Sequence, residues 1–275
     1  MRPVYREPQT ALDSVLPRAH YTVYSYHVLG GALLRQIGEY CSYCEVALAG
    51  NAAVEHIMSK SQDATLETEW DNFLLACVNC NSRKGAKTEK ASDLDDYLWP
   101  CDITRDSSSA YQYYWDASAG VGNEVARVRV SPTAPTTYGD RPANTLALVG
   151  LDIDRSQDPA VPDRRADNRT TTWRVAVRLA NDLASFGNTL AAYDGELAGL
   201  LIDQIVATAT SLGFWSVWMT VFRARLTQAG MLTTSIDALL LRLFVRTFPG
   251  TYWGANQAAF APIPTGHTGL PGGRT

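Results

Sequence analysis

The chain has 275 residues, of which 46% are hydrophobic and 19% are charged, and its formal net charge is -4 at pH 7. This length and composition support a buried core in one large or two modest domains and exclude a chain that is disordered throughout. The negative charge excludes indiscriminate binding to nucleic acid, because affinity for a polyanion rests mainly on Lys and Arg, so any such contact needs a local basic patch or a partner.

The opening stretch, MRPVYREPQT, lacks the apolar core of a signal peptide, and no uninterrupted apolar run is long enough to span a bilayer. We therefore expect a cytoplasmic protein that has no membrane partner. In that compartment, paired cysteines bind metal more often than they form disulfides. Cys101 stands outside the pairs and is expected to be a small, partly buried residue.

The first 40 residues predict an arm followed by a helix. Prolines at positions 3, 8 and 17 predict an irregular arm over residues 1–19. Apolar residues then recur at helical spacing from Tyr21 to Gly38, although Gly30 and Gly31 weaken this helix.

Two Cys-x-x-Cys pairs bracket the stretch from Cys41 to Lys87. Each short turn supplies two thiolates from one side, and a tetrahedral Zn²⁺ accepts four. We predict that one zinc ion is bound by Cys41, Cys44, Cys77 and Cys80.

A second set of polar residues lies between and just after the cysteine pairs: Glu55, His56, Asn72 and Asn81. A carboxylate, an imidazole and two amides are proton-transfer groups and ligands suited to Mg²⁺ or Mn²⁺. Two unlike metal sites in one short segment indicate a scaffold beside a reaction centre.

Local patterns place these residues on elements. A strand is expected over Asn51–Ser59, apolar packing over Trp70–Ala76, and a helix that begins in NSRKGAK and carries Asn81. Four cations gather after the second pair: Arg83, Lys84, Lys87 and Lys90. Positive charge is therefore concentrated beside the proposed reaction centre.

Beyond Leu94 the chain has β character, with clear alternation in Val125–Val130. An aromatic cluster, YQYYW, precedes it at residues 111–115. Such aromatics can stack on bases, but strand packing is the expected role. Residues 131–145 are rich in turn residues and predict a connection.

A polar linker around residue 160 precedes a helical C-terminal region. Helices are predicted at Trp173–Phe186, Thr189–Leu212, Phe214–Leu226 and Ile236–Phe248. Asn188 and Ser235 are candidate helix caps. The aromatic face of Phe214, Trp215, Trp218 and Phe222 is expected to pack in a core or an interface, and the Pro/Gly-rich residues 261–275 are expected to be disordered.

The motif Glu55-His56, Asn72 and Cys77-x-x-Cys80-Asn81-x-x-Lys84 resembles that of the HNH endonucleases. The stretches YCSYCE, VEHI, EWDNFLLACVNCNS and KG are similar to the PtuB-like HNH subunit of Septu-type and retron-associated anti-phage systems. MRPV at the start and Phe248–Thr251 near the end extend a weaker resemblance over most of the chain.

The resemblance implies an α+β fold, in which a ββα-metal core stapled by the four-cysteine zinc is followed by a mostly α-helical region. The divisions that we expect along the chain are an arm and helix at 1–40, a nuclease domain at 41–150, a helical region at 151–260 and a tail at 261–275. The arm and the helical region are the expected surface for docking a partner.

It also implies roles for the central residues. His56 is the expected general base for hydrolysis of a phosphodiester, and Glu55 and Asn81 are expected to hold one Mg²⁺ or Mn²⁺ against the scissile phosphate. Many relatives have Asp in place of Glu55 and His in place of Asn81. Asn72 is expected to brace the loop and orient His56. The predicted phosphate contacts are Arg83 and Lys84.

The expected products carry 5′-phosphate and 3′-hydroxyl ends. The implied partners are a nucleic-acid substrate, with DNA favoured over RNA, an ABC/SMC-like ATPase of the PtuA type and, in some systems, a retron reverse transcriptase with its DNA–RNA product. Two alternatives remain open. In one, the cysteines form a plain zinc ribbon; in the other, the chain is a zinc-bearing adaptor with a degenerate HNH centre.

Overall fold

The computed structural model describes residues 1–7, 27–61, 63–88, 91–153, 163–245 and 247–251. The predicted tail at 261–275, most of the N-terminal arm and the first turns of the helix expected from Tyr21 lie outside these ranges. Within them, none of the helices combines the length and the hydropathy that crossing a bilayer requires.

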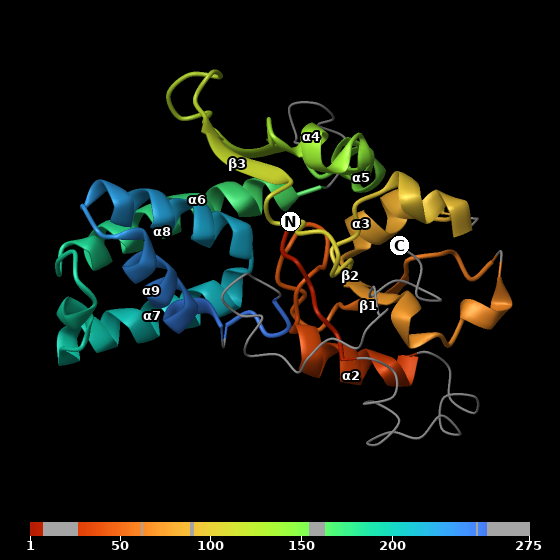
Figure 1. The fold of residues 1–275 in the computed structure, drawn as a ribbon, viewed down its shortest axis with the longest axis horizontal. Coiled ribbons are helices and arrows are strands. Elements are labelled where there is room, and N and C mark those ends of the chain that lie inside the picture. Colours follow the sequence, from red (N-terminus) through yellow and green to blue (C-terminus); the bar gives the residue numbers. More distant parts are fainter. Residues whose placement is uncertain (8–26, 62, 89–90, 154–162, 246, 252–275) are drawn as a thin grey trace.

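The molecule combines two small sheets with many helices. Figure 1 shows the helices of residues 165–244, which we call the helical group, lying beside the part that holds the hairpin of residues 53–76, which we call the central hairpin. The helices are α2 (His27–Ile37), α3 (Val78–Lys84), α4 (Ala134–Tyr138), α5 (Arg141–Val149), α6 (Arg165–Ala184), α7 (Glu196–Leu212), α8 (Trp215–Gln228) and α9 (Thr233–Phe244). Short 3-10 turns are η2 (Ala64–Leu66), η3 (Trp70–Asn72), η4 (Ala91–Asp96) and η5 (Leu190–Tyr193).

The central hairpin pairs β1 (Ala53–His56) with β2 (Phe73–Ala76) in antiparallel register, so that His56 lies opposite Phe73 and Glu55 opposite Leu74. All four residues of β2 are buried, and α2 packs against both strands. Helix α3 starts directly after β2 and contacts β1. The strand predicted over Asn51–Ser59 is therefore present, although shorter.

The second hairpin pairs β3 (Tyr111–Asp116) with β4 (Val125–Val130) and packs against α6 and α8. Tyr111 and Tyr113 are buried, in agreement with a packing role. Trp115 follows them on the same face of the strand and is only half-buried.

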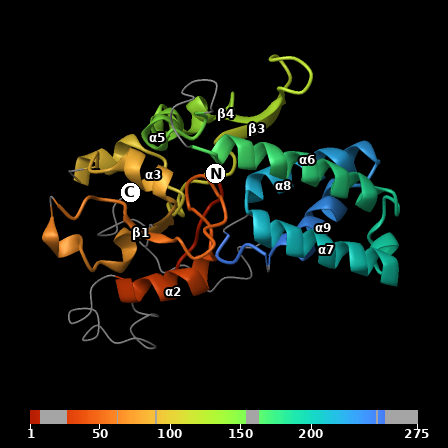
Figure 2. The same cartoon turned by 180° about the vertical axis from the view of Figure 1, so that it is seen from behind.

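Helices α6 to α9 form the helical group in the second half of the chain, and Figure 2 shows them from behind. The aromatic face predicted to pack is fully or almost fully buried: Phe214, Trp215, Trp218 and Phe222. Trp218 and Phe222 each contact the ring of Phe244 from α9. Burial of these rings accounts for much of the apolar surface that holds the helical group together.

Two predicted connections are wrong in part. Residues 131–145, expected as turns, contain α4 and the start of α5, and α6 begins at Arg165 inside the expected linker. Pro135 and Pro142 lie in the first turns of α4 and α5. Proline is tolerated there because the first helical N–H groups have no intrahelical acceptor. The residues therefore start helices where composition suggested a loop.

The predicted caps are also wrong. Helix α7 is preceded by Gly195 and α9 by Leu232, and neither has a side-chain cap hydrogen bond. The segment predicted as one helix from Thr189 is divided into η5 and α7. Asn188 therefore precedes a short 3-10 turn, and Ser235 lies inside α9.

The described part of the N-terminal arm is folded into the protein. Arg2 is fully buried and donates hydrogen bonds to the carbonyls of Ile37 and Pro249, both at 2.8 Å. Arg6 donates to the carbonyls of Trp70 and Phe73 beside β2. Residues 2–6 thus tie α2, the central hairpin and the segment after α9 together.

Candidate active site and metal centre

The four cysteines of the two Cys-x-x-Cys pairs meet in one cluster, with two of them before β1 and two directly after β2. Their Sγ atoms all lie within 4.8 Å of one another, and the sulfurs of Cys44 and Cys77 are 3.7 Å apart. A tetrahedral zinc with Zn–S bonds of about 2.3 Å requires sulfurs about 3.8 Å apart. The cluster therefore fits a structural Zn²⁺, while Cys101 is buried outside it.

A buried arginine touches this cluster from the helical group. Arg165, at the start of α6, donates to the Sγ of Cys80 at 3.1 Å and to the carbonyl of Val149 at 2.8 Å. Its guanidinium is also paired with Asp163 at 2.6 Å. A cation beside a thiolate favours the charged ligand form that zinc requires. Sequence reasoning missed Arg165, because it lies in the stretch assigned to a linker and about 85 residues beyond its sulfur partner.

The first cysteine turn is joined to the helical group by Glu45. Its carboxylate is buried and accepts hydrogen bonds from the backbone N–H of Ser216 at 2.7 Å and from the Ser216 hydroxyl at 2.6 Å. Its carbonyl accepts from the N–H of Phe214 at 2.8 Å. A carboxylate at the first turn of α8 satisfies N–H groups that have no intrahelical acceptor and complements the helix dipole.

His56 ends β1 with its ring packed edge-on against Phe73, with 5.0 Å between the ring centroids. The Nε2 atom is 3.1 Å from the carbonyl oxygen of Glu67. A carbonyl can only accept, so Nε2 carries the proton and the lone pair of the neutral ring lies on Nδ1. Burial lowers the pKa of His56, which keeps the imidazole neutral near pH 7.

Glu55 points toward α3, where it forms a buried ion pair with Lys84. The Lys84 Nζ is 2.8 Å from a Glu55 carboxylate oxygen and donates to the His56 carbonyl at 2.7 Å. Burial raises the pKa of Glu55, and the charge of Lys84 opposes that rise. Lys84 is 1% exposed, so in this structure it neutralises Glu55 and lies away from solvent, where the sequence predicted a phosphate contact.

Asn72 is fully buried at the end of η3 and holds the loop that follows β1. Its Oδ1 accepts from the N–H of Met58 at 2.8 Å, and its Nδ2 donates to the carbonyls of Met58 at 3.0 Å and Leu66 at 3.2 Å. The carbonyl of Glu67, which receives the His56 hydrogen bond, follows Leu66 directly. The amide thus closes the loop on which the orientation of His56 depends.

The remaining predicted residues lie on α3. Asn81 is half-buried and one helical turn before Lys84, so the two share a face of the helix. Arg83 lies against Gly150, and its Nε is 3.8 Å from a carboxylate oxygen of Asp163. Lys87 is exposed, and Lys90 lies outside the described residues.

Residues 41–87 match the family model described as HNH endonuclease. The matched range contains the cysteine cluster, both strands of the central hairpin and α3. It supports a nuclease that acts on nucleic acid and uses a divalent metal. No curated protein and no solved structure matches the chain.

Proposed function

We propose that the chain is a metal-dependent HNH endonuclease that hydrolyses phosphodiester bonds through His56. The observation that carries the proposal is the place of this imidazole. It is buried enough to stay neutral, is oriented by the Glu67 carbonyl and lies on a hairpin that is followed directly by α3. We infer that β1, β2 and α3 form the ββα-metal core of the family, with the cysteine cluster as its staple.

In this proposal, the lone pair on Nδ1 of His56 takes the proton from the attacking water, and Nε2 keeps its hydrogen bond to Glu67. Glu55 and Asn81 would be the oxygen donors for Mg²⁺ or Mn²⁺, an ion that would supply charge neutralisation for the hydrolysis. Lys84 holds the Glu55 carboxylate toward α3. Asn72 fixes the loop that orients His56.

We propose further that the nuclease belongs to an anti-phage complex with an ABC/SMC-like ATPase, as the resemblance to PtuB-like subunits implies. Helix α7 supports a docking role for the helical group, because Leu197 and Leu200 are 70% and 64% exposed. Deleting the helical group is an unsuitable test, since it removes Ser216 from buried Glu45. Charged substitutions at both leucines should instead weaken a pull-down of the ATPase while leaving the unfolding midpoint unchanged.

The experiment that tests the nuclease is cleavage of plasmid, single-stranded DNA and tRNA by the zinc-loaded chain with Mg²⁺, with and without the ATPase. The matched control is His56→Ala. Cleavage that disappears in the variant supports the proposal and names the substrate class. Cleavage that survives in His56→Ala contradicts it, and the absence of any cleavage favours the zinc-bearing adaptor.

A further inference from the structure

An open pocket of about 450 Å³ lies far along the chain from the HNH match, where β3, α6 and α8 meet. Trp115 from β3 and Trp173 from α6 form one wall, with 6.1 Å between ring centroids and 27° between ring planes. Both indoles are only half-buried, whereas Tyr111 and Tyr113 of β3 and Trp215 of α8 are buried. Two near-parallel tryptophans that face solvent leave an aromatic surface available to a ligand.

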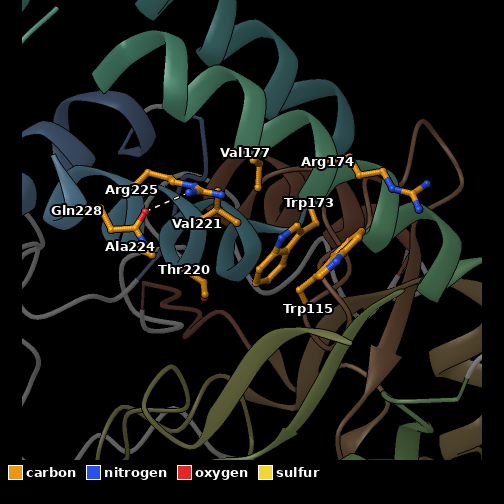
Figure 3. A pocket seen from close by; sticks show the side chains of 9 residues that line it. All are labelled: Trp115, Trp173, Arg174, Val177, Thr220, Val221, Ala224, Arg225 and Gln228. Carbon is orange, nitrogen blue, oxygen red and sulfur yellow. Dashed lines mark hydrogen bonds between the residues drawn. The ribbon is translucent and has the colours of Figure 1, made fainter. Parts of the chain in front are cut away.

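The pocket carries positive charge beside these rings. Figure 3 shows the indoles between Arg174 on one side and Arg225 on the other. Arg174 is 54% exposed and lies over Trp115 at 5.4 Å, and its only ion pair in the described part of the chain is a 3.7 Å contact with Glu124. Arg225 donates a 3.0 Å hydrogen bond to the side-chain oxygen of Gln228. No acidic side chain is among the described residues that line the pocket.

A second cavity of about 400 Å³ adjoins the first, because Thr220 and Ala224 of α8 line both. Its walls include Tyr111, Trp215 and Arg223. The two cavities are therefore neighbours along α8, and together we call them the groove. Their walls carry aromatic side chains and arginines, of which Arg223 is paired with Asp237 at 2.6 Å. A chain molecule fits such a groove better than a compact ligand does.

We propose that this groove binds single-stranded nucleic acid, with a base stacked on the Trp115–Trp173 wall and phosphates beside Arg174 and Arg225. Stacking on aromatic rings together with arginine contacts to the backbone is how proteins hold single strands without reading sequence. The inference rests on the proposed function. It adds to what the HNH centre offers, since of the two predicted phosphate contacts there Lys84 is buried against Glu55 and Arg83 lies 3.8 Å from Asp163, and a second basic surface would help to retain a polyanion.

The test is binding of a short fluorescein-labelled oligo(dT) strand to His56→Ala protein, which cannot consume the probe. Trp115→Ala should weaken binding about 10-fold, whereas Trp115→Phe keeps a stacking ring and should keep most of the affinity. Quenching of tryptophan fluorescence by the unlabelled strand should be lost with Trp115→Ala.

The arginines provide a second test that leaves packing intact. Replacing both Arg174 and Arg225 with Gln should lower the slope of log affinity against log salt by about 1.4, since each phosphate contact on a single strand contributes about 0.7. The matched control is Arg242→Gln on α9, an arginine about as exposed (48%) as Arg174 (54%), which should leave the slope unchanged.

An affinity and salt slope in the double arginine variant equal to those of Arg242→Gln would overturn the proposal. Weaker binding of purified ATPase by that variant, with oligo(dT) affinity unchanged, would also overturn it and identify a protein-docking site. Because binding is measured without cleavage, a positive result stands even if the nuclease test fails. If the enzyme cleaves nucleic acid but the tryptophan and arginine variants bind oligo(dT) normally, the proposal for the groove is wrong and the proposed nuclease activity stands.

Discussion

Lys84 carries its charge inside the protein, where it contacts two consecutive residues of β1. It neutralises the Glu55 carboxylate and donates to the His56 carbonyl. An uncompensated charge in that position would be costly, because burial already raises the pKa of Glu55. Lys84 is therefore a positioning residue. It fixes Glu55, the proposed metal ligand, relative to His56, the proposed base.

We predict that Lys84→Met lowers the free energy of unfolding by about 3 kcal/mol, because it leaves Glu55 buried without its partner. The measurement is urea unfolding of the zinc-loaded protein. Lys87→Met, at an exposed position on the same segment, should change the value by less than about 0.5 kcal/mol. Adding Glu55→Gln to the lysine variant should restore part of the loss; equal values for the two lysine variants would refute the buried pair.

Docking of the first cysteine turn against the α7–α8 connection requires a glycine at the contact. Gly213 has φ +76°, and a Cβ there would lie 2.4 Å from the carbonyl oxygen of Glu45, a backbone atom that cannot swing aside. Gly230 has a similar φ of +81°, but the nearest atom to its Cβ would be 3.7 Å away, at the end of the Asn188 side chain. The two positions share a positive φ and differ in the contact, and Gly213, with ψ −147°, lies in a backbone region that is almost confined to glycine.

Gly213→Ala is therefore expected to lower the free energy of unfolding by at least about 2 kcal/mol more than Gly230→Ala does. Denaturant midpoints of the two zinc-loaded variants make the comparison. A similar loss in both would mean that the positive φ alone decides the cost and that the cysteine turn does not press on the connection.

At the level of elements, the sequence predicted the features that residues close to one another in the chain determine. The Cys-x-x-Cys turns and the β1 strand could be predicted because ligand spacing and alternation are local properties. Arg165 and Glu45 could not be assigned, because their partners, Cys80 and Ser216, are distant in the sequence. The same holds for Lys84, whose spacing fits a surface phosphate contact as well as it fits the buried pair with Glu55.

Across the whole molecule, the metal cluster lies where the nuclease match and the helical group meet. Glu45, directly after Cys44, caps α8, and Arg165 of α6 donates to the sulfur of Cys80. The first cysteine pair is therefore linked by hydrogen bonds to α8, and the second pair to α6. A division of the chain into independent domains near residue 150 would require these buried contacts to be weak.

We predict that removing zinc with a chelator unfolds both parts together. Structural zinc contributes about 10 kcal/mol or more, which is comparable to the whole stability of a domain, about 5–15 kcal/mol, and the released thiols would no longer hold Glu45 and Arg165 in place. Hydrogen exchange with and without the chelator should show loss of protection in the central hairpin and in the first turns of α6 and α8. Cys101→Ser is the control, since it lies outside the cluster and should keep the same zinc content. If the chelator leaves hydrogen exchange in α6 and α8 unchanged, the helical group folds alone, as the boundary at residue 150 implies. The cluster would then stabilise only the part that contains the HNH match.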